Sequence, residues 1–166
     1  MSKIIRVLVA DDMEKIAEIH KNIAMNIENV EVIGVAYNGE EELEMIQKLN
    51  PDLVITDNKM PKTDGIEVIE KINELNIENK PEFILVTGEQ NSELIKKCNE
   101  LEVFRMISKL SGSDRLLYAI QEFIDYKNSS DSRNKNSVIA ESKNNESKKG
   151  FLGKILKSMK KEKEKI

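Results

Sequence analysis

The run Leu53-Val54-Ile55-Thr56-Asp57 decides the fold, because an apolar run that stops at an acid is typical of a buried strand ending at a site. A second apolar run, residues 4–10, stops in the same way at Asp11 and Asp12. The carboxyl ends of parallel strands open onto one edge of a sheet, so we expect the three carboxylates to converge. They would repel one another unless a hard divalent cation such as Mg²⁺ neutralised them.

Two further apolar runs add a hydroxyl and an ammonium group to the same edge. Residues 83–86 are followed by Thr87, and residues 104–107 are followed by Ser108 and Lys109. A lysine can neutralise phosphoryl oxygens, a threonine can donate a hydrogen bond to them, and a metal can bridge them to a carboxylate. An aspartate so surrounded can act as a nucleophile and form an aspartyl phosphate. The pattern therefore predicts Asp57 as the nucleophile.

The full set of motifs resembles a response-regulator receiver domain of the chemotaxis-regulator type, over about residues 4–126. The residues that carry the resemblance, in order, are Asp11-Asp12, Asp57, Met60-Pro61, Asp64-Gly65, Thr87-Gly88 and Lys109. Within that family, residues 5–45 are most similar to receivers of sporulation-initiation regulators.

The resemblance implies a magnesium-dependent phosphoacceptor of a two-component system or phosphorelay, and no enzyme beyond self-phosphorylation and autodephosphorylation. A histidine kinase or phosphotransfer protein would donate the phosphoryl group to Asp57. Thr87 and Lys109 would bind the phosphoryl oxygens. The metal ligands would be Asp11, Asp12, Asp57 and the backbone carbonyl of Lys59.

Apolar periodicity and caps predict five helices between and after the strands, at residues 13–27, 39–49, 64–75, 92–101 and 113–126. Five strands alternating with five helices predict an α/β fold with a doubly wound parallel sheet in the order 2-1-3-4-5. His20 and Cys98 both fall in helices. We expect His20 to be solvated and Cys98 to be a reduced packing or surface residue.

The composition of the 166 residues predicts a receiver domain at residues 1–126 followed by an appendage. Residues 127–149 are rich in Ser, Asn and Lys, which predicts a disordered linker. No apolar stretch approaches the roughly 20 residues of a spanning helix, and no signal-peptide pattern opens the chain, so we expect a cytoplasmic protein. About 40 residues after the receiver are too few for a winged helix, so no DNA-binding output and no nucleic-acid partner are expected.

Residues 150–166 predict a basic amphipathic helix. Its apolar face holds Phe151, Leu152, Ile155, Leu156 and Met159, and its opposite face holds Lys154, Lys157, Lys160 and Lys161. Residues 148–166 carry eight lysines and two glutamates, a net charge of +6, and subtracting this from the chain's −4 leaves −10 for the rest. The segment could bind an anionic membrane surface at residues 150–161, on the inner face of the membrane. It could also dock on an acidic protein surface, including its own receiver, or serve as a solubilising tail.

Two positions depart from the receiver pattern. Met106 stands where receivers usually carry an aromatic residue, which puts the usual switch in doubt, and methionine can fill the same space flexibly. Leu110 follows Lys109 where a proline in a cis peptide is usual, so we expect a trans bond here. Lys59 and Glu89 should flank the mouth of the site with opposite charges, and a partial ion pair between them could hinder the attacking water.

Three competing interpretations stay open at this point. A phosphohydrolase of the haloacid-dehalogenase type also uses a strand-end aspartate, but it resembles a pattern with a second aspartate where Lys59 stands. A pseudo-receiver would bind partners without phosphorylation, which the complete acidic set argues against. Asp11 and Asp12 could instead merely cap the following helix. The sequence names neither the cognate kinase, the stimulus, the downstream target nor the oligomeric state.

Overall fold

The computed structural model describes residues 2–135, which form a five-stranded sheet flanked by five α-helices. All strand pairs are parallel, and the order is β2-β1-β3-β4-β5, as predicted. The strands are β1 (Ile5–Ala10), β2 (Val30–Ala36), β3 (Leu53–Thr56), β4 (Glu82–Thr87) and β5 (Arg105–Ser108). The sequence therefore predicted both the fold class and the strand order correctly.

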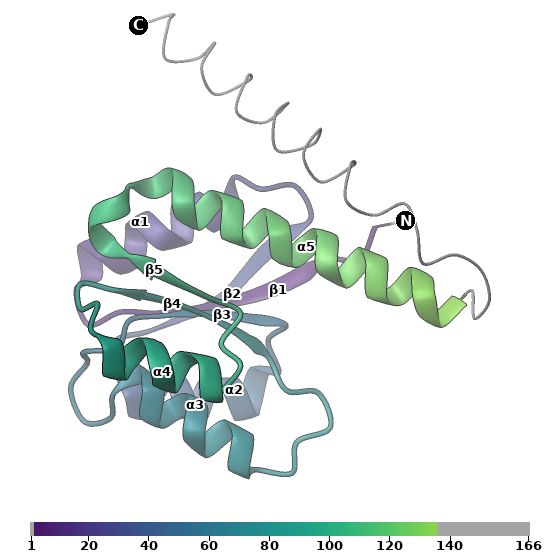
Figure 1. Ribbon diagram of the computed structural model, residues 1–166. Helices are drawn as coiled ribbons and strands as arrows, with labels where there is room; N and C mark the ends of the chain where they lie inside the picture. The colour runs from purple at the N-terminus through teal and green to yellow at the C-terminus, as the bar shows by residue number, and fades with distance from the viewer. Residues whose placement is uncertain (1, 136–166) are drawn as a thin grey trace, which may run out of the picture. The chain divides into compact units, whose positions relative to one another are not determined.

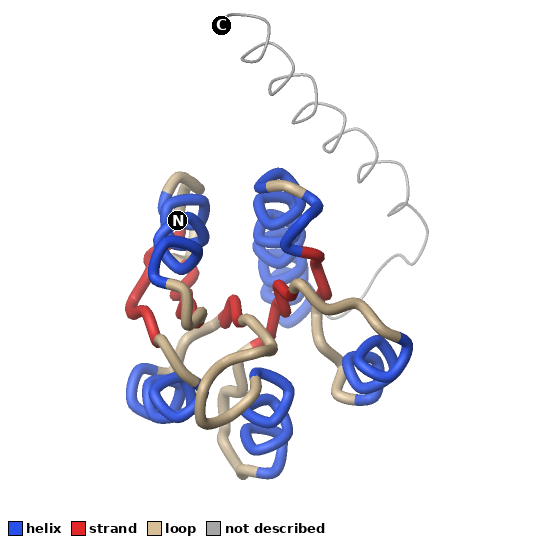
Figure 2. The backbone as a smooth tube through the Cα atoms, turned by 90° about the vertical axis from the view of Figure 1, so that its left-hand side faces the viewer, coloured by secondary structure: helices blue, strands red, loops and turns tan. Residues whose placement is uncertain are grey.

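The helices cover the two faces of the sheet unequally. Figures 1 and 2 show α1 and α5 on one face and α2, α3 and α4 on the other. The helices are α1 (Glu14–Met25), α2 (Gly39–Leu49), α3 (Gly65–Glu74), α4 (Ser92–Glu100) and α5 (Ser113–Lys135), and a 3₁₀ turn, η1 (Lys109–Ser111), precedes α5. Right-handed parallel crossovers place helices on both faces in this way.

Two hydrophobic clusters fill the spaces between the sheet and its helices. Val7 and Val9 of β1 join the cluster that contains Phe123 of α5, whereas Leu8 joins the cluster that contains Ile69 of α3. Successive strand residues point to opposite faces of a sheet, so β1 supplies both clusters. All three β1 residues are 0% exposed, which fixes the strand end and thereby the position of Asp11.

The face of helix α1 that packs on the sheet is rotated from the one centred on its isoleucines, of which Ile23 packs on the core. The buried residues of the helix are Ala17, His20 and Ala24, while Ile19 is 48% exposed. The two alanines let the helix approach the sheet closely, and this turns His20 inward. The prediction that His20 is solvated is therefore wrong, and burial lowers the pKa of its imidazole.

Helix α2 begins and ends where the sequence predicts. The Asn38 side chain accepts a hydrogen bond from the Glu41 amide at 3.0 Å, as a helix N-cap does. Asn50 ends the helix in the left-handed conformation, with φ at 47°. A Cβ on Gly39 would collide with the carbonyl oxygen of Thr63, so the absent side chain lets α2 contact the β3–α3 loop.

Helix α5 continues beyond the predicted end at Tyr126 and reaches Lys135. The beginning of the segment predicted as a linker is thus helical. The rest of that segment, residues 136–149, and the predicted amphipathic helix at residues 150–166 lie outside the described residues. Within the described part of the chain, no helix is both long and apolar enough to cross a bilayer.

Candidate functional site

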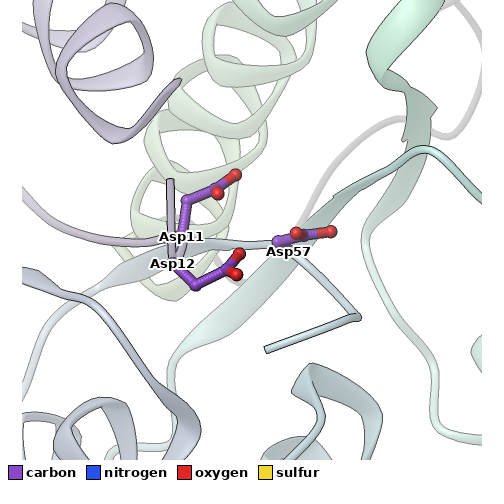
Figure 3. A group of neighbouring side chains, drawn as sticks. All are labelled: Asp11, Asp12 and Asp57. Carbon is purple, nitrogen blue, oxygen red and sulfur yellow. The ribbon is translucent and has the colours of Figure 1, made fainter. Parts of the chain in front are cut away.

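The three predicted acidic residues lie together at the carboxyl edge of the sheet, as Figure 3 shows. Asp11 and Asp12 follow β1, and Asp57 follows β3, which pairs directly with β1. One carboxylate oxygen from each residue lies within 4.8 Å of the other two. Asp11 and Asp57 are buried, whereas Asp12 is exposed. The expected convergence of the strand ends is therefore observed.

Asp11 does not serve as the N-cap of the helix that follows it. The N-cap position of α1 is Met13, and it forms no side-chain capping bond. Asp11 Oδ1 accepts a hydrogen bond from the Met13 amide at 3.0 Å, which leaves Oδ2 directed at the other site residues. A role for this residue limited to helix capping is therefore excluded.

Lys109 joins the acidic cluster from the first residue of η1, directly after β5, which lies two strands away from β3. Its ammonium group donates a hydrogen bond to Asp57 Oδ2 at 2.9 Å. Lys109 Nζ also lies 2.9 Å from Asp11 Oδ2. The same ammonium group therefore pairs with both buried carboxylates of the cluster.

The surroundings shift the pKa of both Asp57 and Lys109. Burial raises the pKa of Asp57, and the hydrogen bond and charge of Lys109 oppose that increase. Burial lowers the pKa of Lys109, but Asp57 and Asp11 outweigh this effect, and the net result is a raised pKa. Lys109 therefore remains a cation at neutral pH.

One ammonium group does not balance three carboxylates, so the cluster keeps an excess of negative charge. The ligand atoms on offer are hard carboxylate oxygens, and two of the three carboxylates are buried. A hard divalent cation prefers oxygen ligands of this kind. The residues present therefore fit a metal site that uses Asp11, Asp12 and Asp57.

Thr87 lies at the same edge of the sheet, at the end of β4, and is 1% exposed. It pairs in register with Ser108 of β5, the residue before Lys109. Its hydroxyl oxygen accepts a hydrogen bond from the Glu89 amide at 3.1 Å. Thr87 is thus near the cluster, but its hydroxyl group faces its own loop.

Comparison with known proteins agrees with this arrangement. The family model of the response regulator receiver domain matches residues 7–121. The chain belongs to this family. Receivers of this kind are phosphoacceptors in two-component signalling, and the acidic cluster is the phosphorylation pocket of this receiver.

Two curated relatives come from Bacillus subtilis (strain 168). The receiver is 40% identical over 121 residues to a protein-glutamate methylesterase/protein-glutamine glutaminase, covering 71% of this chain and 33% of that protein. It is 30% identical over 122 residues to the probable C4-dicarboxylate response regulator DctR, covering 74% of this chain and 53% of that protein. The chain thus spans about a third and about half of their respective lengths.

A solved structure of a response regulator domain is also similar to this chain. The response regulator domain of Thermotoga maritima CheB superposes with a TM-score of 0.65 at 26% identity, covering 75% of this chain and 98% of that one.

The receiver differs from the sequence prediction at the mouth of its pocket. Lys59 Nζ lies 3.7 Å from Asp64 Oδ2, and no ion pair joins Lys59 to Glu89 among the described residues. Asp64 belongs to the same loop as Lys59, so it provides the nearer acid. The expected pair of Lys59 with Glu89 is therefore wrong, and the exposed Lys59 side chain is directed along its own loop.

The peptide bond between Lys109 and Leu110 is trans, as predicted, since no cis bond occurs in the described residues. The Leu110 amide donates to the Ser108 hydroxyl oxygen at 3.2 Å, and the Leu110 side chain is 92% exposed. The residue after the receiver's lysine is therefore displayed to solvent beside the pocket.

Met106 occupies a half-buried position between β5 and α4, where it joins the cluster around Leu85. Its Sδ atom lies 3.7 Å from the Sγ of Cys98, which is buried as a packing residue. Phe104, by contrast, packs edge-on against Phe123 of α5 with ring centroids 5.6 Å apart. Two different residues thus fill the spaces on either side of β5 in this receiver.

Sequence reasoning missed two residues that hold the phosphoacceptor loop. The Asn58 amide donates to Asp57 Oδ1 at 2.7 Å, and the Asn58 side chain accepts from the Ile66 amide at 3.1 Å. Glu42 of α2 is 0% exposed and lies behind β3, with Oε2 3.0 Å from Thr56 Oγ1. Glu42 shares helical spacing with Ile46, and this spacing was the available signal.

Proposed function

We propose that this receiver is a phosphorylation-controlled switch in which Asp57 accepts a phosphoryl group from a histidine kinase or phosphotransfer protein. The observation that carries the proposal is the position of Lys109, 2.9 Å from one oxygen of Asp57 and from one of Asp11. A cation in this place can stabilise the negative charge on the oxygens of a phosphoryl group during its transfer to Asp57.

The proposed transfer moves phosphorus from nitrogen to oxygen. An Asp57 carboxylate oxygen attacks the phosphorus of a phosphohistidine, a P–O bond forms, and the P–N bond breaks with its electron pair going to the imidazole. Lys109 exchanges its contact with the Asp57 oxygen for one with a phosphoryl oxygen. Thr87 turns its hydroxyl group from the Glu89 amide and donates to a second phosphoryl oxygen.

We assign Mg²⁺ to the acidic cluster, held by Asp11, Asp12, Asp57 and the backbone carbonyl of Lys59. When bound, this ion supplies positive charge to the phosphoryl oxygens. The proposal rests on the excess of carboxylates over cations in the cluster. The phosphorylated receiver then changes its affinity for a downstream protein.

The methylesterase activity in the name of one relative is not carried over, because the match covers 33% of that protein and concerns the receiver. The similarity of residues 5–45 to receivers of sporulation-initiation regulators supports a narrower proposal, in which the phosphodonor belongs to a phosphorelay. We place the protein in the cytoplasm, where such donors act.

Labelling with acetyl phosphate and magnesium tests the proposal. Wild-type protein should become labelled, and Asp57→Asn should not. Asp131→Asn, at an exposed position on α5, is the matched control and should label normally. Label that persists in Asp57→Asn would place the nucleophile elsewhere. Beryllofluoride binding that requires magnesium would exclude a pseudo-receiver, and turnover of phosphate esters would indicate a phosphohydrolase instead.

We further propose that residues 150–161 bind the anionic inner face of the membrane. Five apolar residues fall on one helical face of this segment and four lysines on the other. Such a helix inserts its apolar face between headgroups that attract its lysines. The segment would thus hold the receiver near membrane-bound partners.

A further inference from the structure

Glu42 is a buried acid that the phosphorylation chemistry described so far does not use. It lies on the inner face of α2 together with Gly39 and Ile46, and its side chain is 0% exposed. One carboxyl oxygen, Oε1, has no hydrogen-bond partner among residues 2–135, and the other, Oε2, lies 3.0 Å from the hydroxyl oxygen of Thr56. A buried carboxyl group with this environment requires a physical explanation, because an unpaired buried charge is costly.

The Thr56 hydroxyl group has a single proton but lies within hydrogen-bond distance of two oxygen atoms. Its oxygen lies 3.0 Å from Glu42 Oε2 and also 3.0 Å from the backbone carbonyl oxygen of Asp57. If Glu42 were ionised, two acceptors would compete for that single proton. If Glu42 is neutral, its carboxyl O–H donates a hydrogen bond to Thr56 Oγ1, and the Thr56 hydroxyl group donates to the carbonyl oxygen of Asp57. The neutral form satisfies both contacts and leaves no charge inside the protein.

The surroundings of Glu42 favour that neutral form. Burial raises the pKa of Glu42 to about 8, the hydrogen bond with Thr56 opposes the increase, and the negative charge of Asp57 adds to it. Among the described residues, Asp57 is the charged group that acts on Glu42 across this interface. At pH 7 the carboxyl group is therefore mostly protonated.

We propose that Glu42 is a positioning residue for the phosphoacceptor: its neutral carboxyl group holds the Thr56 hydroxyl, and that hydroxyl holds the carbonyl group of Asp57. This inference rests on the proposed function, since it assigns a role in phosphorylation at Asp57. It joins α2 to the peptide that carries the nucleophile.

The chain of contacts completes a set of constraints around Asp57. The Asp57 amide donates to the Ala10 carbonyl at 3.0 Å, which fixes the peptide against β1. A Cβ on Gly65 would collide with the Asp57 carbonyl oxygen, so α3 closes a second side. The Glu42–Thr56 pair holds the same carbonyl group from α2. Loss of the proton from Glu42 would disturb this contact. It would also add negative charge next to a pocket that is proposed to receive a negatively charged phosphoryl group.

The first test compares phosphorylation rates of the full chain with acetyl phosphate and magnesium from pH 6 to pH 9. Glu42→Gln keeps the size of the side chain and a donor for Thr56 but cannot titrate. The wild-type rate should fall about three- to tenfold relative to Glu42→Gln as the pH rises through about 8, the size of effect that one hydrogen bond supports. Below pH 7 the two rates should agree. Identical pH profiles would overturn the proposal.

Thr56→Val tests the second contact in the chain. This substitution should slow phosphorylation at every pH, and it should reduce the change that Glu42→Gln makes in the pH profile. Glu40→Gln makes the same chemical change at an exposed position of α2 and should follow the wild-type profile. A Thr56→Val variant with the wild-type rate and profile would contradict the role of the hydroxyl group.

A spectroscopic measurement separates failure of this inference from failure of the proposed function, because it requires no phosphorylation. The ¹³C chemical shift of the Asp57 carbonyl should titrate with a midpoint near pH 8 in the wild type and not in Glu42→Gln. Infrared difference spectra between these proteins should show a protonated carboxyl group at pH 7. An ionised Glu42 at that pH would sink the inference, even if Asp57 accepts phosphate normally.

Discussion

Lys109 Nζ lies 2.9 Å from Asp57 Oδ2, and this contact joins the end of β5 to the end of β3 across β4. The ammonium group is 22% exposed and the Asp57 carboxylate 6% exposed, so the pair is largely screened from water. Its removal should therefore affect stability as well as phosphorylation.

Lys109→Met removes the charge and keeps an unbranched side chain. Removing one partner from a buried ion pair costs about 3–5 kcal/mol, and partial exposure of Lys109 places the expected loss near the lower value. Added magnesium should recover part of the lost stability, because the carboxylates would gain another cation. Thermal unfolding with and without magnesium measures both effects. Lys97→Met, which removes an exposed ion pair of 3.8 Å, is the control and should cost under about 1 kcal/mol. Equal losses in both variants would contradict the prediction.

The stability of the protein should depend on pH through Glu42. Its pKa is raised to about 8 in the folded state, while its ordinary value is 4.5, so the folded protein keeps a proton that the unfolded chain loses between these values. The contribution of Glu42 to stability is therefore fully present below pH 4.5 and is lost as the pH rises to about 8. Relative to Glu42→Gln, the wild type should lose a few kcal/mol over that range and show no further change above it. Urea unfolding at several pH values measures the difference, and a constant difference would rule this linkage out.

Gly65→Ala should slow phosphorylation and destabilise the fold, although alanine is the better helix former. Its Cβ would meet the carbonyl oxygen of Asp57, and the resulting displacement should cost about 1–3 kcal/mol. Gly88→Ala is the matched control, because a Cβ there meets nothing within 4 Å. Unfolding free energies and acetyl phosphate labelling should separate the two variants. If both label at the wild-type rate, the close contact does not position Asp57.

Membrane binding by residues 150–161 should depend on both faces of the predicted helix. Wild-type protein should sediment with anionic vesicles at low salt, weakly with neutral ones, and less as salt is added. Leu152→Glu with Leu156→Glu should abolish binding while every lysine remains. Ser142→Glu with Ser147→Glu adds the same charge to the predicted linker and should weaken binding only modestly. Failure of the wild type to sediment, or equal binding by the leucine variant, would favour docking on a protein surface.

The fold and the acidic cluster could be predicted from the sequence, because the ends of the apolar runs mark the ends of the strands. Asp11, Asp57 and Lys109 each follow a strand, and parallel topology brings such positions to one edge. No knowledge of side-chain packing is needed for that step. The residues of the pocket could therefore be identified before their distances were known.

The misplaced residues depended on packing between elements instead. Glu42, which the sequence analysis did not single out, ends a run of three glutamates, and its position relative to Ile46 turns it inward. His20 faces the sheet because Ala17 and Ala24 bring α1 close, which the isoleucine pattern does not reveal. Residues after Tyr126 are weak helix formers, but no glycine or proline stops α5 before Lys135. Local composition alone does not determine these three outcomes.

The ion pair between Lys109 and Asp11 also has a consequence for the order of folding. It joins the last strand to the first, so the pocket cannot exist until nearly the whole domain has assembled. Contacts between residues so distant in sequence form late, because the intervening chain must first lose its freedom. A chain still emerging from the ribosome, or one that has lost β5, would hold its aspartates without the cation between them. Only the finished sheet therefore brings Lys109 and the acidic cluster together.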